Sequence, residues 1–468
     1  MSDGKRRLTR VDEIVEKVTL MLEAGAYKAF ERLPSVRHGA RAHGVSKNTM
    51  AEAYDRLVAR GLLEARPGSG YYISQVRPDT PAPSAPHVAA AVDGISLLRE
   101  QLEKHYEVRP GDGRPPPFWM EGSELRRHFA VAKVPYPEEI QFGYGSFWGF
   151  GPLRDRLRIQ LLERSIPVQP DGLLLTNGVN HGLDLIIRHL TEPGDTVFVD
   201  EPGYYPLFSK LTFAKLNIVG IRRDRDGPDL DDLAAKLAVH RPKMFFTQSH
   251  GHNPTGGSLS PSRSFGLMQL AERWGILLVE NDALSDILPS TLPRLAALNE
   301  LSRVLYLGSF SKTLSASLRC GYVAGSPEII RRLADIKMIT QVNSSEHVER
   351  FVFNLIQAGH YLRHLRRLRG RVEEAYKAAF GCLEALGLSL MESSVPGFYL
   401  WAEFPGEIDE QELCAEASRA SIFISPGSVF YPNRKTRRRA AMRVNAAYGT
   451  DPRFLGFLDD FLKRAGAG

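Results

Sequence analysis

The stretch Gly308-Ser-Phe-Ser-Lys-Thr-Leu-Ser-Ala316 holds a lysine among small hydroxyl residues, and an arginine follows seven positions after the lysine. An amine can condense with an aldehyde, while hydroxyl groups and a fixed guanidinium suit a phosphate. Lys312, Ser309 and Arg319 therefore suit pyridoxal 5′-phosphate (PLP), which carries both groups. The apolar run 304–307 predicts a buried strand that ends just before the lysine, where ligands bind in open α/β sheets. Surface loops also carry Ser-x-Ser-Lys, so this motif alone does not distinguish a PLP site from an ordinary loop.

Three further loops contain residues that suit the same cofactor. Asn177-Gly-Val-Asn180 joins a predicted strand to a helix, and Gly178 lets the backbone approach a phosphate at the helix N-terminus. Tyr204 follows another apolar run, and its ring suits a flat heteroaromatic group. Asn253 precedes a proline, which favours an extended backbone, and its amide can donate to a phenolate oxygen. Each loop also has an ordinary interpretation. Gly178 could lie in a common βα turn, Tyr204 could be a buried tyrosine in a bent loop, and Asn253 could lie in a simple turn.

The composition is that of a soluble globular protein, with 43% hydrophobic and 24% charged residues among 468. This length predicts two or three domains. No apolar run approaches the roughly 20 residues of a membrane helix, and the basic N-terminus lacks a signal-peptide core. The three cysteines are scattered without metal-ligand spacing. We expect a cytoplasmic protein with no membrane contact and no metal site.

Two proline-rich breaks divide the chain. Residues 78–86 carry four prolines and predict a stiff extended linker, and residues 110–117 form a second break. We expect a linker with a short helix over 78–117, between domains at 8–77 and 118–468. Before the linker the chain holds 14 lysines and arginines against nine acidic residues. This excess suits a polyanion such as DNA, although solvated helix faces produce it too.

After residue 117, short apolar runs alternate with helical patterns, which predicts parallel βαβ units. The predicted strands are 173–175, 197–199, 244–246, 276–279 and 304–307. The tail predicts a long helix from Glu349 to Leu386 and strands near 397–403, 421–424 and 441–445. We expect a large α/β domain with a small α+β C-terminal subdomain.

Residues 33–49 predict a helix, a tight turn and a second helix. Ser35 and Ser46 are natural N-caps, and Gly44 lies at the turn. Arg66-Pro-Gly-Ser-Gly70 then predicts a glycine-tipped hairpin, so the segment has the layout of a winged helix-turn-helix. A three-helix protein-interaction module is the alternative.

The order Leu-Pro-Ser-Val-Arg37, Val-Ser-Lys-Asn-Thr49 and Arg-Pro-Gly-Ser-Gly70 resembles the GntR family of transcription regulators. The resemblance covers essentially all of 10–77 and implies binding to double-stranded DNA. The residues expected to meet DNA are Arg37, Ser46, Lys47, Asn48, Thr49, Gly68, Ser69 and Gly70.

From about 140 to 460 the loops described above, together with Phe142 to Arg154 and Ala441 to Asn445, resemble the class I/II aminotransferases of PLP fold type I. This resemblance implies PLP as the cofactor. It implies that Lys312 carries the aldimine and that Ser309 and Arg319 hold the phosphate. It also implies that Tyr204 stacks on the ring and that Asn253 bonds to O3′.

The same resemblance implies roles at both ends of the domain. Gly178, Val179 and Asn180 would bind the phosphate, and Tyr144 would reach the phosphate of the partner subunit in a homodimer. Arg443 would bind the carboxylate of a substrate or effector, which its charge and fork geometry suit. An ordinary salt bridge is the alternative for Arg443.

One position departs from the aminotransferase pattern. The family places an aspartate at the end of the strand before the lysine strand, where it keeps the pyridine nitrogen protonated, and a tyrosine three residues later. Here the strictest register places Asn281 and Leu284 at these positions. Asp282 is adjacent, and although neighbouring strand residues point to opposite faces, a one-residue shift or a bend in the loop would bring Asp282 to the cofactor instead. Both residues are therefore candidates for contact with the cofactor. If Asn281 faces the ring nitrogen, PLP would bind while transamination is weak.

A GntR-type domain, a linker and an aminotransferase-like domain together resemble the MocR subfamily of regulators. The resemblance implies a PLP-binding transcription regulator that senses PLP or an amino compound and presents two DNA-binding heads as a dimer. A working aminotransferase with a DNA-binding head is one alternative. A degenerate domain that binds an effector without PLP is another.

Overall fold

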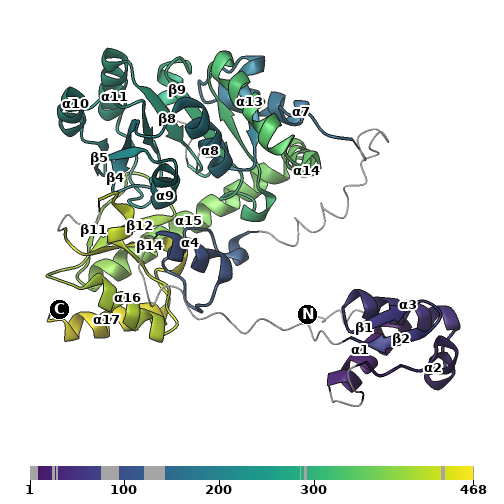
Figure 1. Ribbon diagram of the computed structural model, residues 1–468. Helices are drawn as coiled ribbons and strands as arrows, with labels where there is room; N and C mark the ends of the chain where they lie inside the picture. Colours follow the sequence, from purple (N-terminus) through teal and green to yellow (C-terminus); the bar gives the residue numbers. More distant parts are fainter. Residues whose placement is uncertain are drawn as a thin grey trace. The chain divides into compact units, whose positions relative to one another are not determined.

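The structure is a computed structural model that describes residues 9–23, 27, 30–74, 94–120, 143–284, 286–288, 292–433 and 438–466. The chain divides into two compact units, Met1–Ala85 and Pro86–Gly468, and Figure 1 shows the elements of both. The expected linker at 78–86 lies outside the described residues.

The N-terminal unit consists of three helices and a hairpin. Its elements are α1 (Arg10–Glu23), α2 (Val36–His43), α3 (Lys47–Ala59), β1 (Leu63–Arg66) and β2 (Gly70–Ile73). Met50, Ala53, Tyr54 and Leu57 form the buried stripe of α3 and pack into one core with residues of α1. The unit is the expected winged helix-turn-helix.

Side-chain caps start both helices of the motif, as the sequence predicts. The Ser35 hydroxyl accepts a hydrogen bond from the N–H of His38, and the Ser46 hydroxyl accepts one from the N–H of Thr49 at 3.1 Å. Gly44 ends α2 with φ at 63°, a left-handed conformation in which glycine is least strained. The turn between the helices is therefore fixed by local chemistry.

An eight-stranded sheet forms the centre of the larger unit, in the order β3-β10-β9-β8-β7-β4-β5-β6. Its strands are β3 (Leu173–Thr176), β4 (Thr196–Glu201), β5 (Asn217–Asp224), β6 (Gly227–Pro228), β7 (Met244–Thr247), β8 (Leu277–Asn281), β9 (Val304–Ser309) and β10 (Gly321–Ala324). The parallel pairing of β4, β5, β7, β8 and β9 confirms the predicted alternation. Three strands, β5, β6 and β10, were not predicted from the sequence. Of these, β10 runs antiparallel between β9 and β3.

Helices cover both faces of this sheet (Figure 1). They are α7 (Gly151–Leu162), α8 (Val179–Leu190), α9 (Tyr205–Phe213), α10 (Leu230–Val239), α11 (Pro261–Trp274), α12 (Leu295–Leu298), α13 (Pro327–Gln341), α14 (Glu346–Gln357) and α15 (His360–Ala385). Leu173 and Leu175 pack into one apolar cluster with α7, α10, α11, α14 and α15, whereas Leu174 packs into a second with α8, α9 and α13. Burial on both faces explains the continuous apolar strands. Among the described residues, no helix combines the length and apolar character that a bilayer crossing requires.

A smaller sheet in the order β11-β12-β14-β13 forms the expected α+β subdomain with the second half of α15. Its other elements are β11 (Ser389–Leu390), β12 (Tyr399–Glu403), β13 (Ser425–Pro426), β14 (Ala441–Asn445), α16 (Glu410–Arg419) and α17 (Pro452–Arg464). The helix α4 (Gly94–Glu103) and the chain after it also belong to the larger unit. Val108 forms a bridge with Ile422, and the N–H of Gly111 donates to the carbonyl of Phe423 at 2.7 Å.

Two expectations about the tail are corrected. The long helix expected from Glu349 to Leu386 is two helices, because Gly359 takes a φ of 71° between α14 and α15. The strand expected near 421–424 contains a single bridge, and the ladder of β13 begins only at Ser425.

Candidate functional site

The loops after β3, β4, β7, β8 and β9 meet at one edge of the large sheet. They line a cavity of about 520 Å³. Of the residues predicted to bind the cofactor, those that line it are Val179, Asn180, Tyr204, Asn253, Asn281, Ser309, Lys312 and Arg319. Five loops that are far apart in sequence thus converge, because the carboxyl ends of these strands lie on the same side.

Lys312 projects into this cavity from the loop after β9. Its ammonium group donates a hydrogen bond to the carbonyl of Gly113. Burial lowers the pKa of the Lys312 amine to about 7, and the nearby guanidinium groups of Arg443 and Arg114 act in the same direction against the carboxylate of Asp112. The amine is therefore largely uncharged just above neutral pH, which is the form that attacks a carbonyl.

The first turn of α8 forms an anion cradle with Arg319. Gly178 precedes the helix with φ at 79° and supplies no side-chain cap, so the first N–H groups of the helix remain for a ligand. One Nη of Arg319 donates to the carbonyl of Asn177 at 2.8 Å, and the other lies 3.3 Å from the Ser311 hydroxyl. A Cβ atom at position 178 would lie 2.7 Å from the guanidinium. The glycine is thus required for the close approach of Arg319.

Tyr204 and Asn253 also line the cavity. The Tyr204 hydroxyl is 3.5 Å from Oδ1 of Asn180. Oδ1 of Asn253 accepts a hydrogen bond from Arg443 at 2.9 Å. Because the carbonyl end of this amide is occupied, its NH₂ group is the part that can donate to a ligand.

The end of β8 resolves which of two neighbouring residues faces the cavity. Asn281 lines it, and its Oδ1 atom is buried with no hydrogen-bond partner among the described residues. Asp282 points to the opposite face, where its carboxylate accepts hydrogen bonds from Nε of Arg294 at 3.1 Å and from the Tyr306 hydroxyl at 2.8 Å. The expectation that Asp282 contacts the cofactor is corrected by the two-residue period of the strand.

Arg443, the expected carboxylate ligand, lies beside Asn253, and its Nε atom is buried with no hydrogen-bond partner among the described residues. Its side chain is almost fully buried, with 1% of the residue exposed. Nη1 donates to Asn253, and Nη2 donates to the carbonyl of Gly111 at 2.5 Å. Tyr399 and Phe430 lie on its guanidinium, each with its ring centroid 5.2 Å away. Arg443 is not among the residues that line the cavity.

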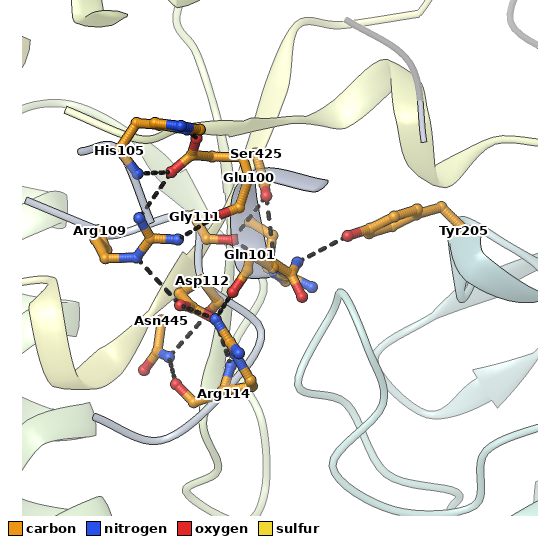
Figure 2. A network of polar contacts seen from close by, with 11 residues as sticks. Glu100, Gln101, His105, Arg109, Gly111, Asp112, Arg114, Tyr205, Ser425 and Asn445 are labelled. Carbon is orange, nitrogen blue, oxygen red and sulfur yellow. Dashed lines mark hydrogen bonds and ion pairs between the residues drawn. The ribbon is translucent and has the colours of Figure 1, made fainter. Parts of the chain in front are cut away.

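The segment from α4 to Arg114 is a part of the site that the sequence analysis missed, because it was interpreted as linker. Its centre is an ion network in which Arg109 pairs with Glu100 at 2.8 Å and with Asp112 at 3.2 Å (Figure 2). Arg114 pairs with the same Asp112 and donates to the carbonyl of Gln101. The alternating charges after a predicted helix were the available signal.

Of the two remaining expected positions, Leu284 lines the cavity and Tyr144 does not. Leu284 lines the cavity where the aminotransferase pattern has a tyrosine, so that hydroxyl is missing. Tyr144 is 85% exposed and does not line the cavity of its own chain.

The winged helix-turn-helix presents its candidate residues in two groups. Arg37, Lys47 and Asn48 are exposed, and none makes a side-chain hydrogen bond within the described part of the chain. The side chains of Ser46 and Thr49 are hydrogen-bonded to each other at 2.8 Å within the cap. In the hairpin, Gly68 takes a φ of 73° and Gly70 a φ of 107°, while the Ser69 hydroxyl lies 2.6 Å from that of Tyr72.

Comparison with known families gives two matches along the chain. The aminotransferase class I and II family matches residues 142–457, and the gntR family of bacterial regulatory proteins matches residues 10–73. The chain is a GntR-type regulator whose larger part belongs to the class I and II aminotransferase family. The family predicted from the sequence is confirmed.

Curated relatives with the same layout include regulators from several bacteria. The HTH-type transcriptional regulator YdcR of Escherichia coli is 27% identical over 439 residues, which span 90% of this chain and 92% of the relative. The probable rhizopine catabolism regulatory protein MocR of Rhizobium meliloti is 28% identical over 433 residues, which span 88% of this chain and 85% of the relative.

Solved aminotransferases share the fold of the larger unit of this GntR-type regulator. Kynurenine aminotransferase of Pyrococcus horikoshii has a TM-score of 0.71 at 24% identity and covers 80% of this chain and 95% of its own. The α-aminoadipate aminotransferase LysN of Thermus thermophilus has a TM-score of 0.72 at 24% identity and covers 81% of this chain and 97% of its own. At these identities the likeness establishes the fold.

The lowered pKa of Lys312 predicts how fast the full-length protein reacts with added PLP at each pH. A depressed lysine pKa leaves the amine neutral above about 7, so the reaction rate should rise between pH 6 and 8 and then level off. Stopped-flow absorbance measures this rate, with Lys312→Ala as the variant that should not react. A rate that keeps rising towards pH 10 would mean that the Lys312 amine has an ordinary pKa.

Proposed function

We propose that this regulator binds PLP through Lys312 and senses an amino compound in the same cavity. The observation that carries the proposal is the convergence of an amine of lowered pKa, an anion cradle and an amide donor in one cavity. PLP supplies a carbonyl that condenses with amines and a ring that withdraws electrons. An amino compound would compete with Lys312 for that carbonyl, so the cavity is suited to detecting amines.

Individual residues fit the parts of PLP. Arg319, Ser309 and the first turn of α8 would hold the phosphate, because a cation, a hydroxyl and free N–H groups all favour an anion. The free amide NH₂ of Asn253 would donate to the phenolic oxygen of the ring. The ring of Tyr204 would pack on the heterocycle.

A homodimer is part of the proposal. Tyr144 is a large aromatic residue that is 85% exposed and lies in the loop before α7. In the dimer its hydroxyl would contribute to the phosphate site of the partner subunit. A dimer would also present two winged helices, which suits a DNA site with two half-sites.

A working aminotransferase is the second candidate function, and the end of β8 argues against it. A carboxylate at this position would hold a proton on the ring nitrogen, whereas the Asn281 amide is neutral and cannot stabilise that charge as well. The carboxylate of Asp282 is on the other face and is already paired with Arg294. PLP would therefore bind, with its ring acting as a weak electron sink.

The substitution Asn281→Asp should convert the site towards catalysis. We expect the half-reaction of the PLP-loaded protein with an amino acid to accelerate about tenfold or more, because the new carboxylate stabilises a protonated ring. Single-turnover absorbance measures the rate, and the pH dependence of the cofactor absorption reports ring protonation independently of turnover.

The variant Asp282→Asn is the comparison for this experiment. It should lower thermal stability, since it leaves Arg294 without its carboxylate, and it should leave the pH dependence of the cofactor absorption unchanged. The assignment is wrong if the Asp282 variant changes that pH dependence and the Asn281 variant does not.

Sequence-specific DNA binding is proposed for the first turns of α2 and α3 and for the hairpin. Arg37, Lys47 and Asn48 are exposed and carry unused donors, which suit phosphates and base edges. Each of these side chains is close to a helix start that is fixed by a cap, so their positions are well defined.

Replacing Lys47 with alanine should weaken binding to DNA from the promoter region of this protein's own gene. If Lys47 contacts a phosphate, the slope of log affinity against log salt should fall by about 1. Fluorescence anisotropy at several salt concentrations measures both quantities. Lys17→Ala, an exposed lysine on α1, is the matched control and should change neither. Equal effects of both variants, or a wild-type protein without sequence preference, would overturn the proposal.

A further inference from the structure

A buried network of three polar side chains lies at the end of β3, outside the cavity. The amine of Lys337 on α13 donates to the carbonyl of Leu175 at 2.9 Å and to the Ser344 hydroxyl at 2.8 Å. That hydroxyl donates in turn to the carboxylate of Glu349 on α14. Lys337, Ser344 and Glu349, here called the buried network, are at most 5% exposed. None of them lines the cavity at Lys312, so they can act on a ligand there only through other residues.

The buried network places two opposite charges in the protein interior. Burial lowers the pKa of the Lys337 amine to about 8 and raises the pKa of the Glu349 carboxyl. Apolar side chains of similar volume would cost less free energy to bury. Charged groups, however, donate and accept hydrogen bonds in defined directions, which apolar side chains cannot do. The buried network is therefore suited to holding particular backbone groups in place.

The backbone groups that it holds belong to β3 and to the loop before α7. The second carboxylate oxygen of Glu349 accepts a hydrogen bond from the N–H of Phe150, the N-cap residue of α7, at 2.8 Å. The N–H of Leu175 donates to the carbonyl of Trp148 at 3.1 Å, while the Leu175 carbonyl accepts from Lys337. In addition, α7 packs against α14 (Figure 1). The loop is thus fixed both to β3 and to α14.

Tyr144 lies in the same loop, next to a glycine that is packed on the start of α14. A Cβ atom at Gly145 would lie 2.6 Å from a carboxylate oxygen of Glu346 and 3.1 Å from Nδ2 of Asn343. Tyr144 itself is 85% exposed. Because Gly145 and Phe150 are both fixed on α14, the loop presents the exposed ring of Tyr144 in a defined direction.

We propose that the buried network positions Tyr144 for the phosphate site of the partner subunit. The inference rests on the proposed binding of PLP in a homodimer. Within one chain the network also holds the end of β3, which leads into the anion cradle at Gly178. It therefore connects the anion cradle of one subunit with the loop that reaches the phosphate of the other. Loss of the buried network in one subunit should weaken PLP in the other.

The experiment uses full-length mixed dimers in which only one subunit can bind PLP covalently. One subunit keeps Lys312, the other carries Lys312→Ala, and two affinity tags separate the mixed dimer from both homodimers. The absorption of the cofactor during a PLP titration then reports one site, whose Tyr144 comes from the Lys312→Ala subunit. Glu349→Gln in that subunit should weaken PLP about fivefold or more, because the donated tyrosine loses its fixed position. In the subunit that keeps Lys312 the same substitution should change PLP affinity within about twofold.

Three further variants complete the comparison. Ser344→Ala deletes only the bridging hydroxyl, and it decides the test if removing one of two buried charges unfolds the subunit. It should show the same difference between the two arrangements. Tyr144→Phe should weaken PLP only from the Lys312→Ala subunit. Glu374→Gln, an exposed glutamate of α15, is the matched control and should change neither arrangement.

The inference is overturned if Glu349→Gln and Ser344→Ala have no effect while Tyr144→Phe acts from the Lys312→Ala subunit. Weakening that is equal in both arrangements, or confined to the subunit that keeps Lys312, would indicate a structural role and would also overturn it. If Tyr144→Phe acts from neither subunit, the proposed role of the dimer fails and the inference with it. A mixed dimer that takes up no PLP would instead contradict the proposed PLP function.

Discussion

The parallel pairing of β4, β7, β8 and β9 is the constraint on which the site depends. Because these strands run in one direction, their carboxyl ends place Tyr204, Asn253, Asn281 and Lys312 around a single cavity. The two apolar clusters that cover the faces of the sheet hold these ends in place. A one-residue shift of β8 would exchange Asn281 for a carboxylate, so the register of this strand determines the chemistry of the cavity.

The strand β8 shows why the described part of the cavity has no carboxylate at this edge of the sheet. Glu280 and Asp282 flank Asn281, but both carboxylates lie on the opposite face of β8, where Asp282 pairs with Arg294. Burial raises the pKa of Glu280 to about 7, and this carboxyl accepts hydrogen bonds from the backbone N–H groups at the start of α12. Acidic residues close in sequence are therefore unavailable to the cavity, and the side chain of β8 that lines it is a neutral amide.

The sequence predicted the winged helix-turn-helix down to its caps, because Ser35, Gly44 and Ser46 act through local hydrogen bonds and backbone conformation. It also predicted the central strands, whose burial on both faces makes them continuously apolar. The antiparallel β10 was missed, since its pairing depends on partners distant in the chain. The long helix was predicted where two exist, because a helical pattern alone does not show that Gly359 is left-handed.

The candidate site was predicted only where its residues follow strands that the sequence reveals. Loops that follow recognisable strands could be placed at one edge, which brought Lys312 and Asn253 together correctly. The burial of Arg443 and the position of Arg114 depend on how the chain after α4 packs against the small sheet. Such long-range packing leaves only a weak pattern in the sequence, here a short run of alternating charges around Asp112.

The central claim is that ligand binding at Lys312 alters DNA binding by the same chain. The most direct measurement is the affinity of the PLP-loaded full-length protein for DNA from its own promoter region, with and without a panel of α- and ω-amino acids. At least one amino acid should shift this affinity by about fivefold or more, and Lys312→Ala should bind the DNA without that shift. Equal affinities under all these conditions, despite a change in cofactor absorption, would contradict the account.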